Sequence, residues 1–167
     1  MENSKQKVLI TGASSGLGRE LAHQYAQKGN VELILVARRK EALEKVAKKC
    51  EAFENVKTRV YSVDIGSQEQ VEHLLTSVKD IDILINGAGY GIMKDFSEFS
   101  DHDVVNMFDT NVIGTIQLTT EIAKRMREKK SGTIVTIASL AGKIATPKSS
   151  VYSATKFALI GYFNSLR

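Results

Sequence analysis

The sequence predicts an α/β fold, in which a doubly wound parallel sheet carries helices on both faces. Short runs rich in Val, Ile and Leu alternate along the chain with longer segments whose apolar residues recur at helical spacing. A glycine-rich turn joins the first such run to the first helical segment. The 167 residues, 43% hydrophobic and 25% charged, fit a single domain over residues 1–167 of an ordinary globular protein.

Strands buried on both faces of a parallel sheet are short and almost continuously apolar. On this basis we expect strands at residues 7–11, 31–36, 56–63, 81–85 and 132–138. Since helical segments separate them without exception, the strands form βαβ units, and such units produce a parallel sheet.

The helices occupy the segments between these strands. We expect them at residues 16–28, 40–52, 68–79 and 102–130, the last broken near residue 109, with another from about residue 150. Gly29 and Asn30 predict the C-terminal cap of the first helix. Ser67 and Gln70 predict a capping box on the third, whose buried face is Val71, Leu74, Leu75 and Val78.

The net charge of +4 does not point to nucleic acid. The basic residues gather near the ends of predicted helices, where they complement the helix dipole, and no aromatic residues alternate with them as stacking platforms. No apolar run approaches the length of a membrane span, and residues 1–5 contain no hydrophobic signal region. We therefore expect no nucleic-acid partner and no membrane association.

Cys50 is the single cysteine, so an internal disulfide is excluded and a reducing compartment is favoured. It falls on an apolar helical stripe and is expected to be a packed thiol in a cytoplasmic protein. The histidines, His23, His73 and His102, lie outside every motif and are expected on the surface. No metal-ligand spacing occurs, so no metal site is predicted.

Residues 11–18, Thr-Gly-Ala-Ser-Ser-Gly-Leu-Gly, follow an apolar strand and open onto a helix. A strand, a tight turn and a helix N-terminus in this order form a cradle for a pyrophosphate, which favours a Rossmann-like dinucleotide site over a plain loop. Gly12 permits the turn, Gly16 lets the backbone approach phosphates, and Gly18 lets the helix pack closely on the strand.

Tyr152 and Lys156 are four residues apart and therefore share one face of a helix. An ammonium charge beside a phenol favours the phenolate, which makes the tyrosine usable as a proton donor and acceptor. The pair alone is common on helices and most often structural. The pair indicates a catalytic role here because the glycine turn precedes it and Ser139 lies thirteen residues before Tyr152.

Together these motifs resemble the short-chain dehydrogenase/reductase family. Residues 11–18 match its glycine motif, residues 86–89 its Asn-Ala-Gly-type motif and residues 111–114 its mid-helix asparagine. Ser139, Tyr152 and Lys156 match its catalytic residues at the family's spacings, and the resemblance runs from Lys7 to the last residue.

The resemblance implies an oxidoreductase that interconverts a carbonyl and an alcohol. Tyr152 would exchange a proton with the substrate oxygen, Lys156 would hold the cofactor ribose, and Ser139 would hydrogen-bond the substrate oxygen. Asn111 would fix a water that relays protons through Lys156. Taken singly, Ser139 could merely end a strand, and Asn111 could merely bond the backbone inside a helix.

NADP is the expected cofactor. Ala37 stands where an acidic residue would hold the ribose of NAD, and the Arg38 guanidinium can grip the 2′-phosphate of NADP. Arg38 and Arg39 together carry this cofactor choice, although both could instead be helix-start arginines in solvent, Arg39 more readily than Arg38. Ser15 lacks the basic character that NADP users of the family often have there. Asp64 resembles the residue that binds the adenine amino group, or is a plain turn former. The predicted cofactor-binding residues are Gly12, Ser14, Ser15, Gly16, Leu17, Gly18, Arg38, Asp64, Ile65, Asn86, Gly87, Ala88, Tyr152 and Lys156.

The resemblance also implies seven strands, whereas five are predicted. The strand at 132–138 would then be an open edge, so we expect the chain to be incomplete and to lack the strands and lid that shape a substrate pocket. A non-catalytic module that binds nucleotide or a protein partner is the alternative function. Apolar residues spread around the helix at 102–130 predict a homodimer or homotetramer through it and the Tyr152 helix, although a wide core-facing stripe of a monomer would look similar.

Overall fold

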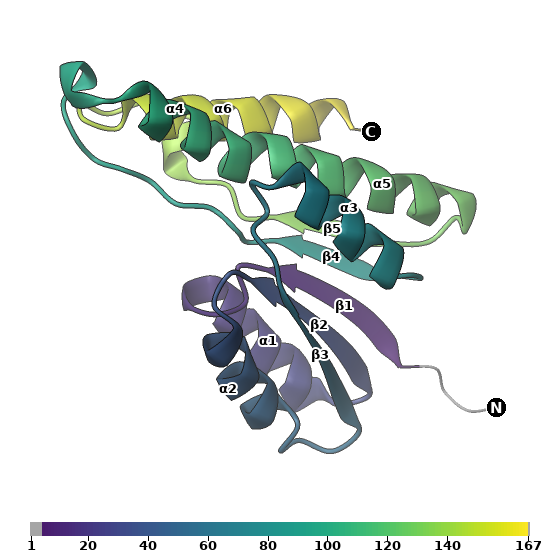
Figure 1. Ribbon diagram of the computed structural model, residues 1–167. Coiled ribbons are helices and arrows are strands. Elements are labelled where there is room, and N and C mark those ends of the chain that lie inside the picture. Colours follow the sequence, from purple (N-terminus) through teal and green to yellow (C-terminus); the bar gives the residue numbers. More distant parts are fainter. Residues whose placement is uncertain (1–4, 167) are drawn as a thin grey trace.

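The computed structural model describes residues 5–166. Its sheet contains β1 (Gln6–Thr11), β2 (Val31–Ala37), β3 (Val56–Ser62), β4 (Ile83–Asn86) and β5 (Thr133–Thr136). Every neighbouring pair is parallel, and the spatial order is β3-β2-β1-β4-β5. The chain therefore moves outward from β1 to β3, crosses back, and moves outward again on the other side. This topology confirms the predicted doubly wound parallel sheet (Figure 1).

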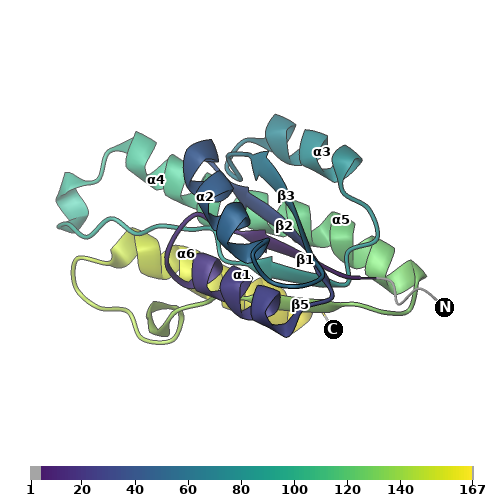
Figure 2. The same ribbon diagram turned by 90° about the horizontal axis from the view of Figure 1, so that it is seen from below.

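The helices lie on both sides of this sheet (Figure 2). They are α1 (Gly16–Lys28), α2 (Lys40–Cys50), α3 (Gln68–Ser77), α4 (Asp101–Phe108), α5 (Gly114–Glu128) and α6 (Ser150–Ser165). Two single 3₁₀ turns, η1 (Phe96–Glu98) and η3 (Leu140–Gly142), were not expected. The predicted break near residue 109 is a π-helical segment, η2 (Asp109–Ile113), which keeps α4 and α5 in one continuous rod.

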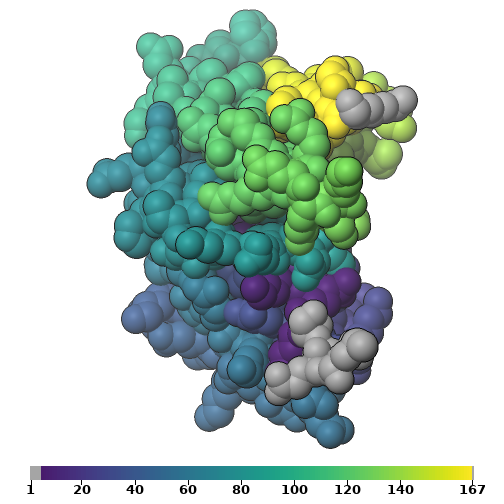
Figure 3. All heavy atoms as spheres, turned by 90° about the vertical axis from the view of Figure 1, so that its right-hand side faces the viewer, coloured from purple at the N-terminus to yellow at the C-terminus, as the bar shows by residue number. Residues whose placement is uncertain are grey.

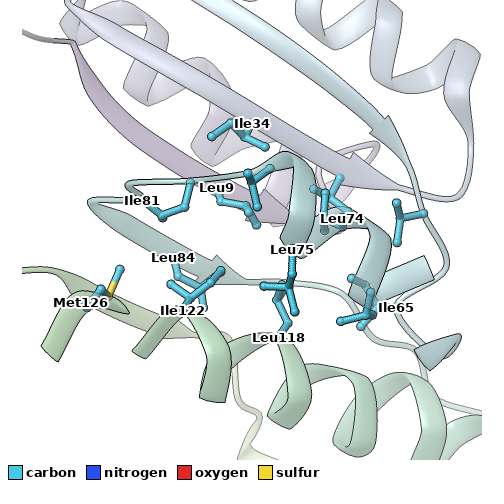
Figure 4. Close-up of a cluster of buried hydrophobic side chains, with 14 residues drawn as sticks. Leu9, Ile34, Ile65, Leu74, Leu75, Ile81, Leu84, Leu118, Ile122 and Met126 are labelled. Carbon is cyan, nitrogen blue, oxygen red and sulfur yellow. The ribbon is translucent and has the colours of Figure 1, made fainter. Parts of the chain in front are cut away.

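Strand alternation divides the core into two clusters. Leu9 faces one side of β1, where α3 and α5 contribute Leu74, Leu118 and Ile122, as Figure 4 shows. Val8 and Ile10 face the other side, where α1 and α2 pack with small and branched residues. The predicted buried face of α3, including Val78 beyond its end, is confirmed.

Helix ends mostly follow the expected cap chemistry. Gly29 adopts φ 70° and Asn30 φ 50°, which confirms the predicted end of α1. Ser67 caps α3 by accepting the Gln70 N–H, but the box is incomplete. The Gln70 Oε1 accepts from the Asp64 N–H at 2.9 Å instead, because the strand-end turn offers a free donor there.

The two sheet edges differ in their protection. On β3, the Arg59 guanidinium bonds the Ser77 carbonyl at 2.9 Å and lies beside Glu32, so charged side chains cover that edge. Among the described residues, β5 pairs only with β4, and Val135 on it is 43% exposed. A groove lined partly by Met126, Ile134 and Phe163 runs beside this edge between α5 and α6. Figure 3 shows these two helices side by side, green and yellow, and Thr120 and Tyr162 hydrogen-bond across them.

Cys50 is completely buried, and its burial raises the pKa of the thiol to about 11. It is therefore a packed, unreactive thiol, as expected. His73 and His102 are exposed, whereas His23 is half-buried and lies 3.8 Å from the Cys50 sulfur. Within residues 5–166, no helix has the length and apolar character needed to cross a membrane.

Candidate functional site

A cleft of about 380 Å³ opens where β1, β2, β3 and β4 end, because the carboxyl ends of parallel strands meet at one edge of the sheet. Its walls come from the turns after those four strands. They are residues 12 and 14–18, 37–39, 63–65 and 87–90, with Thr110 and Ile137 beside them. Of the predicted cofactor-binding residues, all but Asn86, Tyr152 and Lys156 line this cleft.

The glycine turn is held tightly against the loop that follows β4. Gly12 has φ +70°, and a Cβ there would lie 2.5 Å from the Gly87 carbonyl oxygen, so no other residue fits. Thr11 fastens the same two segments together. Its Oγ1 accepts the N–H groups of Gly87 and Ala88 at 3.0 and 3.1 Å. This seam fixes the floor of the cleft.

The N-terminus of α1 faces the cleft in a form suited to an anion. Ser15 is its N-cap residue but makes no side-chain capping bond, and the first turn contains no acidic residue. Gly16 lines the cleft, and no atom from another segment of the described chain lies within 4 Å of where its Cβ would be. The helix dipole and free N–H groups therefore remain available for a phosphate.

Arg38 and Arg39 form one end of the cleft. Both are exposed, and the Arg39 Nη2 donates to the Ser14 hydroxyl at 3.3 Å. Two guanidinium groups thus lie beside the glycine turn, in a position that suits a second phosphate. Arg39 is thus exposed, as its solvent reading expects, and only its contact with Ser14 was not predicted. Its place directly after Arg38 at a strand end was the available signal.

Two further walls contain groups with mixed roles. The Asp64 Oδ1 accepts the Gly66 N–H at 2.9 Å, so Asp64 shapes the turn as well as lining the cleft. Tyr90 was not predicted, and its half-buried side chain lines the cleft. Burial raises the Tyr90 pKa. The Arg38 charge lowers this pKa in part, and nearby carboxylates raise it further, so the phenol stays neutral.

Asn86 does not line the cleft. It is 4% exposed, and its Nδ2 donates to the hydroxyls of Thr119 at 2.9 Å and Thr136 at 3.2 Å. Its buried Oδ1 has no hydrogen-bond partner among the described residues. The side chain therefore joins β4 to α5 and β5, and supports the cleft from behind.

A second cluster lies beside the cleft and contains the predicted catalytic residues. Lys156 is 5% exposed, and its Nζ donates to the Ile137 carbonyl at 3.2 Å and lies 5.6 Å from the centre of the Tyr152 ring. Among residues 5–166, no carboxylate lies within 4 Å of this ammonium. Burial lowers the pKa of Lys156. An unpaired ammonium of this kind favours negative charge in a group placed next to it.

Asn111 is completely buried in the π-helical segment η2. Its Nδ2 donates to the Tyr90 carbonyl at 2.8 Å and to the Thr155 hydroxyl at 3.1 Å, and its Oδ1 accepts the Tyr90 N–H at 3.0 Å. The side chain therefore clamps the loop after β4 to α6. Its predicted role toward a water stays a prediction.

Ser139 is half-buried at the start of η3, and its Oγ accepts the Ala141 N–H at 3.1 Å. The hydroxyl hydrogen of Ser139 therefore remains free to donate. A Cβ at Gly142 would lie 2.9 Å from the Lys156 carbonyl oxygen, so η3 packs closely on α6. Ser139 is thus fixed relative to the helix that carries Tyr152.

The two clusters form one continuous site. Ile137 lines the cleft and accepts the Lys156 hydrogen bond. Gly89 also lines the cleft, and its Cβ position would lie 3.7 Å from the Lys156 Nζ and 3.0 Å from the Asn111 Oδ1. In the described part of the chain, no group of three His, Cys, Asp or Glu side chains could hold a metal ion.

Comparison with known proteins gives consistent results. Residues 6–167 match the family described as short chain dehydrogenase. An NADP-dependent 3-hydroxy acid dehydrogenase of Schizosaccharomyces pombe is 34% identical over 165 residues, which are 96% of this chain and 64% of that protein. Dehydrogenase/reductase SDR family member 7 of Homo sapiens is 39% identical, over 96% of this chain and 49% of its own length. The chain thus spans about half to two thirds of these relatives.

Solved structures of similar fold contain either nicotinamide cofactor. A short-chain dehydrogenase from Sphingobium yanoikuyae in complex with NADPH matches with a TM-score of 0.90 and 30% identity, over 96% of this chain and 64% of its own. An NAD⁺-bound xylitol dehydrogenase matches with a TM-score of 0.85 and 28% identity, over the same shares of the two chains.

Proposed function

The chain belongs to the short-chain dehydrogenase/reductase family, and on that premise we propose an NADP(H)-dependent oxidoreductase that interconverts a carbonyl and an alcohol. The observation that carries the proposal is the buried, unpaired Lys156 ammonium beside the Tyr152 ring, next to a cleft built for a dinucleotide. A nicotinamide cofactor, when bound, supplies or takes up the hydride.

The residues of this chain would manage the proton and the substrate oxygen. The Tyr152 hydroxyl gives its proton to the carbonyl oxygen during reduction and removes it from the alcohol in reverse. The Lys156 ammonium stabilises the phenolate that results. The free hydroxyl hydrogen of Ser139 donates to the same substrate oxygen as negative charge develops there. Asn111 positions these groups by clamping α6 to the loop after β4.

The preference for NADP rests on the two arginines after β2. Arg38 and Arg39 offer guanidinium groups at the cleft, and no carboxylate stands at Ala37 to repel a phosphate. The NADP dependence named for the yeast relative and the NADPH in the Sphingobium structure support this choice, whereas the NAD⁺-bound relative shows that the fold accepts both.

The test is Tyr152→Phe, assayed by NADPH oxidation with a panel of ketones. Removing the hydroxyl should lower kcat by about 10²–10⁴-fold, the usual contribution of a general acid. The dissociation constant for NADPH should stay nearly unchanged, because no cleft residue is altered. Full activity in the mutant would show that another group handles the proton.

A nucleotide-binding module without turnover is the second candidate. The groove between α5 and α6 favours it, since a protein partner can pack there. Saturable NADPH binding without oxidation by any ketone, at the intact mass of this chain, would select this alternative.

The proposal extends to location and assembly. The buried thiol of Cys50 suits the reducing cytoplasm. Exposed apolar residues such as Ile113 and Phe157, on the η2–α5 rod and on α6, support pairing of these helices with a second copy.

A further inference from the structure

Tyr90 stands between two glycines that face the helix carrying the candidate catalytic pair. A Cβ at Gly89 would lie 3.7 Å from the Lys156 Nζ, and a Cβ at Gly91 would lie 2.9 Å from the Tyr152 Cδ2. Both neighbours of Tyr90 therefore face α6 at close range. The Tyr90 side chain instead lines the dinucleotide cleft.

Tyr90 is the only residue of its loop that brings a polar side chain into the cleft. The other loop residues that line it, Gly87, Ala88 and Gly89, offer at most a methyl group. A phenol at this point adds a hydrogen-bonding group to a wall that is otherwise backbone.

The Tyr90 backbone is fixed, and its hydroxyl is free. The completely buried Asn111 accepts the Tyr90 N–H at 3.0 Å and donates to the Tyr90 carbonyl at 2.8 Å. These are the hydrogen bonds of Tyr90 within residues 5–166, and both use the backbone. The phenol can therefore donate to a ligand without breaking a contact, from a position that is already set.

The charges around the Tyr90 phenol come from different walls of the cleft. Arg38 and Asp64 both line the cleft, and both charges act on this phenol. Burial holds the Tyr90 pKa above its ordinary value in spite of Arg38, so the hydroxyl keeps its proton and remains a donor. A phosphate next to Arg38 and the Asp64 carboxylate are the two acceptors that it could serve.

The phosphate is the better acceptor of the two. The Asp64 carboxylate already accepts the Gly66 N–H at 2.9 Å. A terminal phosphate has three strong acceptor oxygens, and one guanidinium fork bonds two of them. A second donor from another wall of the cleft therefore finds an oxygen that Arg38 leaves open.

We propose that the Tyr90 hydroxyl donates a hydrogen bond to the 2′-phosphate beside Arg38, and that Tyr90 thereby helps the cleft to select NADP over NAD. This inference rests on the proposed use of NADP(H) and adds a specificity-determining residue from the loop after β4.

Titrations of NADPH and NADH, followed by the fluorescence of the reduced nicotinamide, test the inference without turnover. Tyr90→Phe should weaken NADPH binding about tenfold, the low end for a hydrogen bond to a charged group, because water reaches the half-buried hydroxyl. NADH binding should change by less than about twofold. Tyr25→Phe is the matched control, because Tyr25 is a half-buried tyrosine of α1 outside the cleft, and it should change neither.

Calorimetry with adenosine 2′,5′-bisphosphate and with 5′-AMP isolates the adenosine end of the cleft, since neither probe contains nicotinamide. Tyr90→Phe should weaken binding of the bisphosphate about tenfold and leave 5′-AMP binding unchanged. Equal losses for both probes would overturn the inference and assign the hydroxyl to Asp64 or to another group that both probes contact. Unchanged binding of the bisphosphate would overturn it as well.

Urea unfolding separates a lost contact from a damaged fold. Because the hydroxyl bonds no other described residue, Tyr90→Phe should unfold at the midpoint of the wild type. A lowered midpoint, with NADPH and NADH weakened alike, would overturn the inference in favour of a structural role. A wild-type chain that binds NADPH but oxidises it with no ketone would refute the proposed carbonyl–alcohol chemistry alone, and the titrations would still decide the role of Tyr90.

Discussion

The seam between the glycine turn and the loop after β4 depends on one hydroxyl, and Thr11→Val removes it with almost no change in shape. Thr11 is 2% exposed, and its Oγ1 accepts the N–H groups of both Gly87 and Ala88. Valine keeps the branched Cβ that suits the end of a strand. The substitution therefore leaves two backbone donors without their acceptor, and it also removes the long hydrogen bond, 3.5 Å, that the same Oγ1 donates to the Ile85 carbonyl.

The expected cost follows from those two donors. A buried N–H without an acceptor costs about 1–3 kcal/mol, so two cost about 2–6 kcal/mol. Gly87 and Ala88 line the cleft and are half-buried, which allows water to replace part of the loss. We therefore expect Thr11→Val to lower the free energy of unfolding by about 2–4 kcal/mol.

Urea unfolding followed by circular dichroism measures this change. With a slope of about 2 kcal/mol per molar urea, the midpoint should fall by about 1–2 M. Thr11→Ser keeps the oxygen and should stay within about 1 kcal/mol of the wild type. A Thr11→Val midpoint equal to that of the wild type, or a Thr11→Ser midpoint as low as that of Thr11→Val, would refute the role of the hydroxyl.

Three other predictions concern the coenzyme, acid stability and assembly. Arg38→Asp should weaken NADPH binding far more than NADH binding, because a carboxylate replaces a phosphate-binding guanidinium; equal losses in titrations of both would contradict this. Lys94 and Ser100 lower the Asp103 pKa from 3.8 to about 2, so the stabilisation is complete above about pH 4 and fades toward pH 2. Asp103→Asn should therefore flatten the fall of the urea midpoint across that range, and an unchanged slope would count against the ion pair. Sedimentation at micromolar concentration should show at least a dimer or concentration-dependent aggregation of this chain, and a stable, soluble monomer would contradict both.

The parts predictable from sequence were those in which chemistry demands a particular residue. The role of Gly12 in the turn could be predicted because the turn accepts no other residue. The burial of Leu9, Ile34 and Leu74 could be predicted because a core requires apolar residues at fixed spacing. Strand ends were less accurate. The strand expected at 132–138 covers only Thr133–Thr136, because the apolar run continues into a loop that lines the cleft.

The parts that escaped prediction depend on contacts between distant residues. Arg39 contacts the site through Ser14, 25 residues earlier in the chain, and no local sequence pattern predicts that contact. Asn86 belongs to a recognisable motif, yet its side chain turns to Thr119 and Thr136 because those hydroxyls lie behind the sheet. In both cases the sequence identifies the residue, and only the packing of the elements decides what it touches.

The π-helical turn η2 contains one residue more than an α-helical turn, and it holds this residue by winding more slowly over its length. α4 and α5 therefore remain one rod on either side of it. Deleting Thr110 would let the turn return to α-helical geometry, and Met107 before it and Leu118 beyond it would stay in the core. The damage would fall on the turn itself, because Thr110 lines the cleft and Asn111 joins Tyr90 to Thr155 from this turn. A single-residue deletion here would therefore harm the site more than the fold.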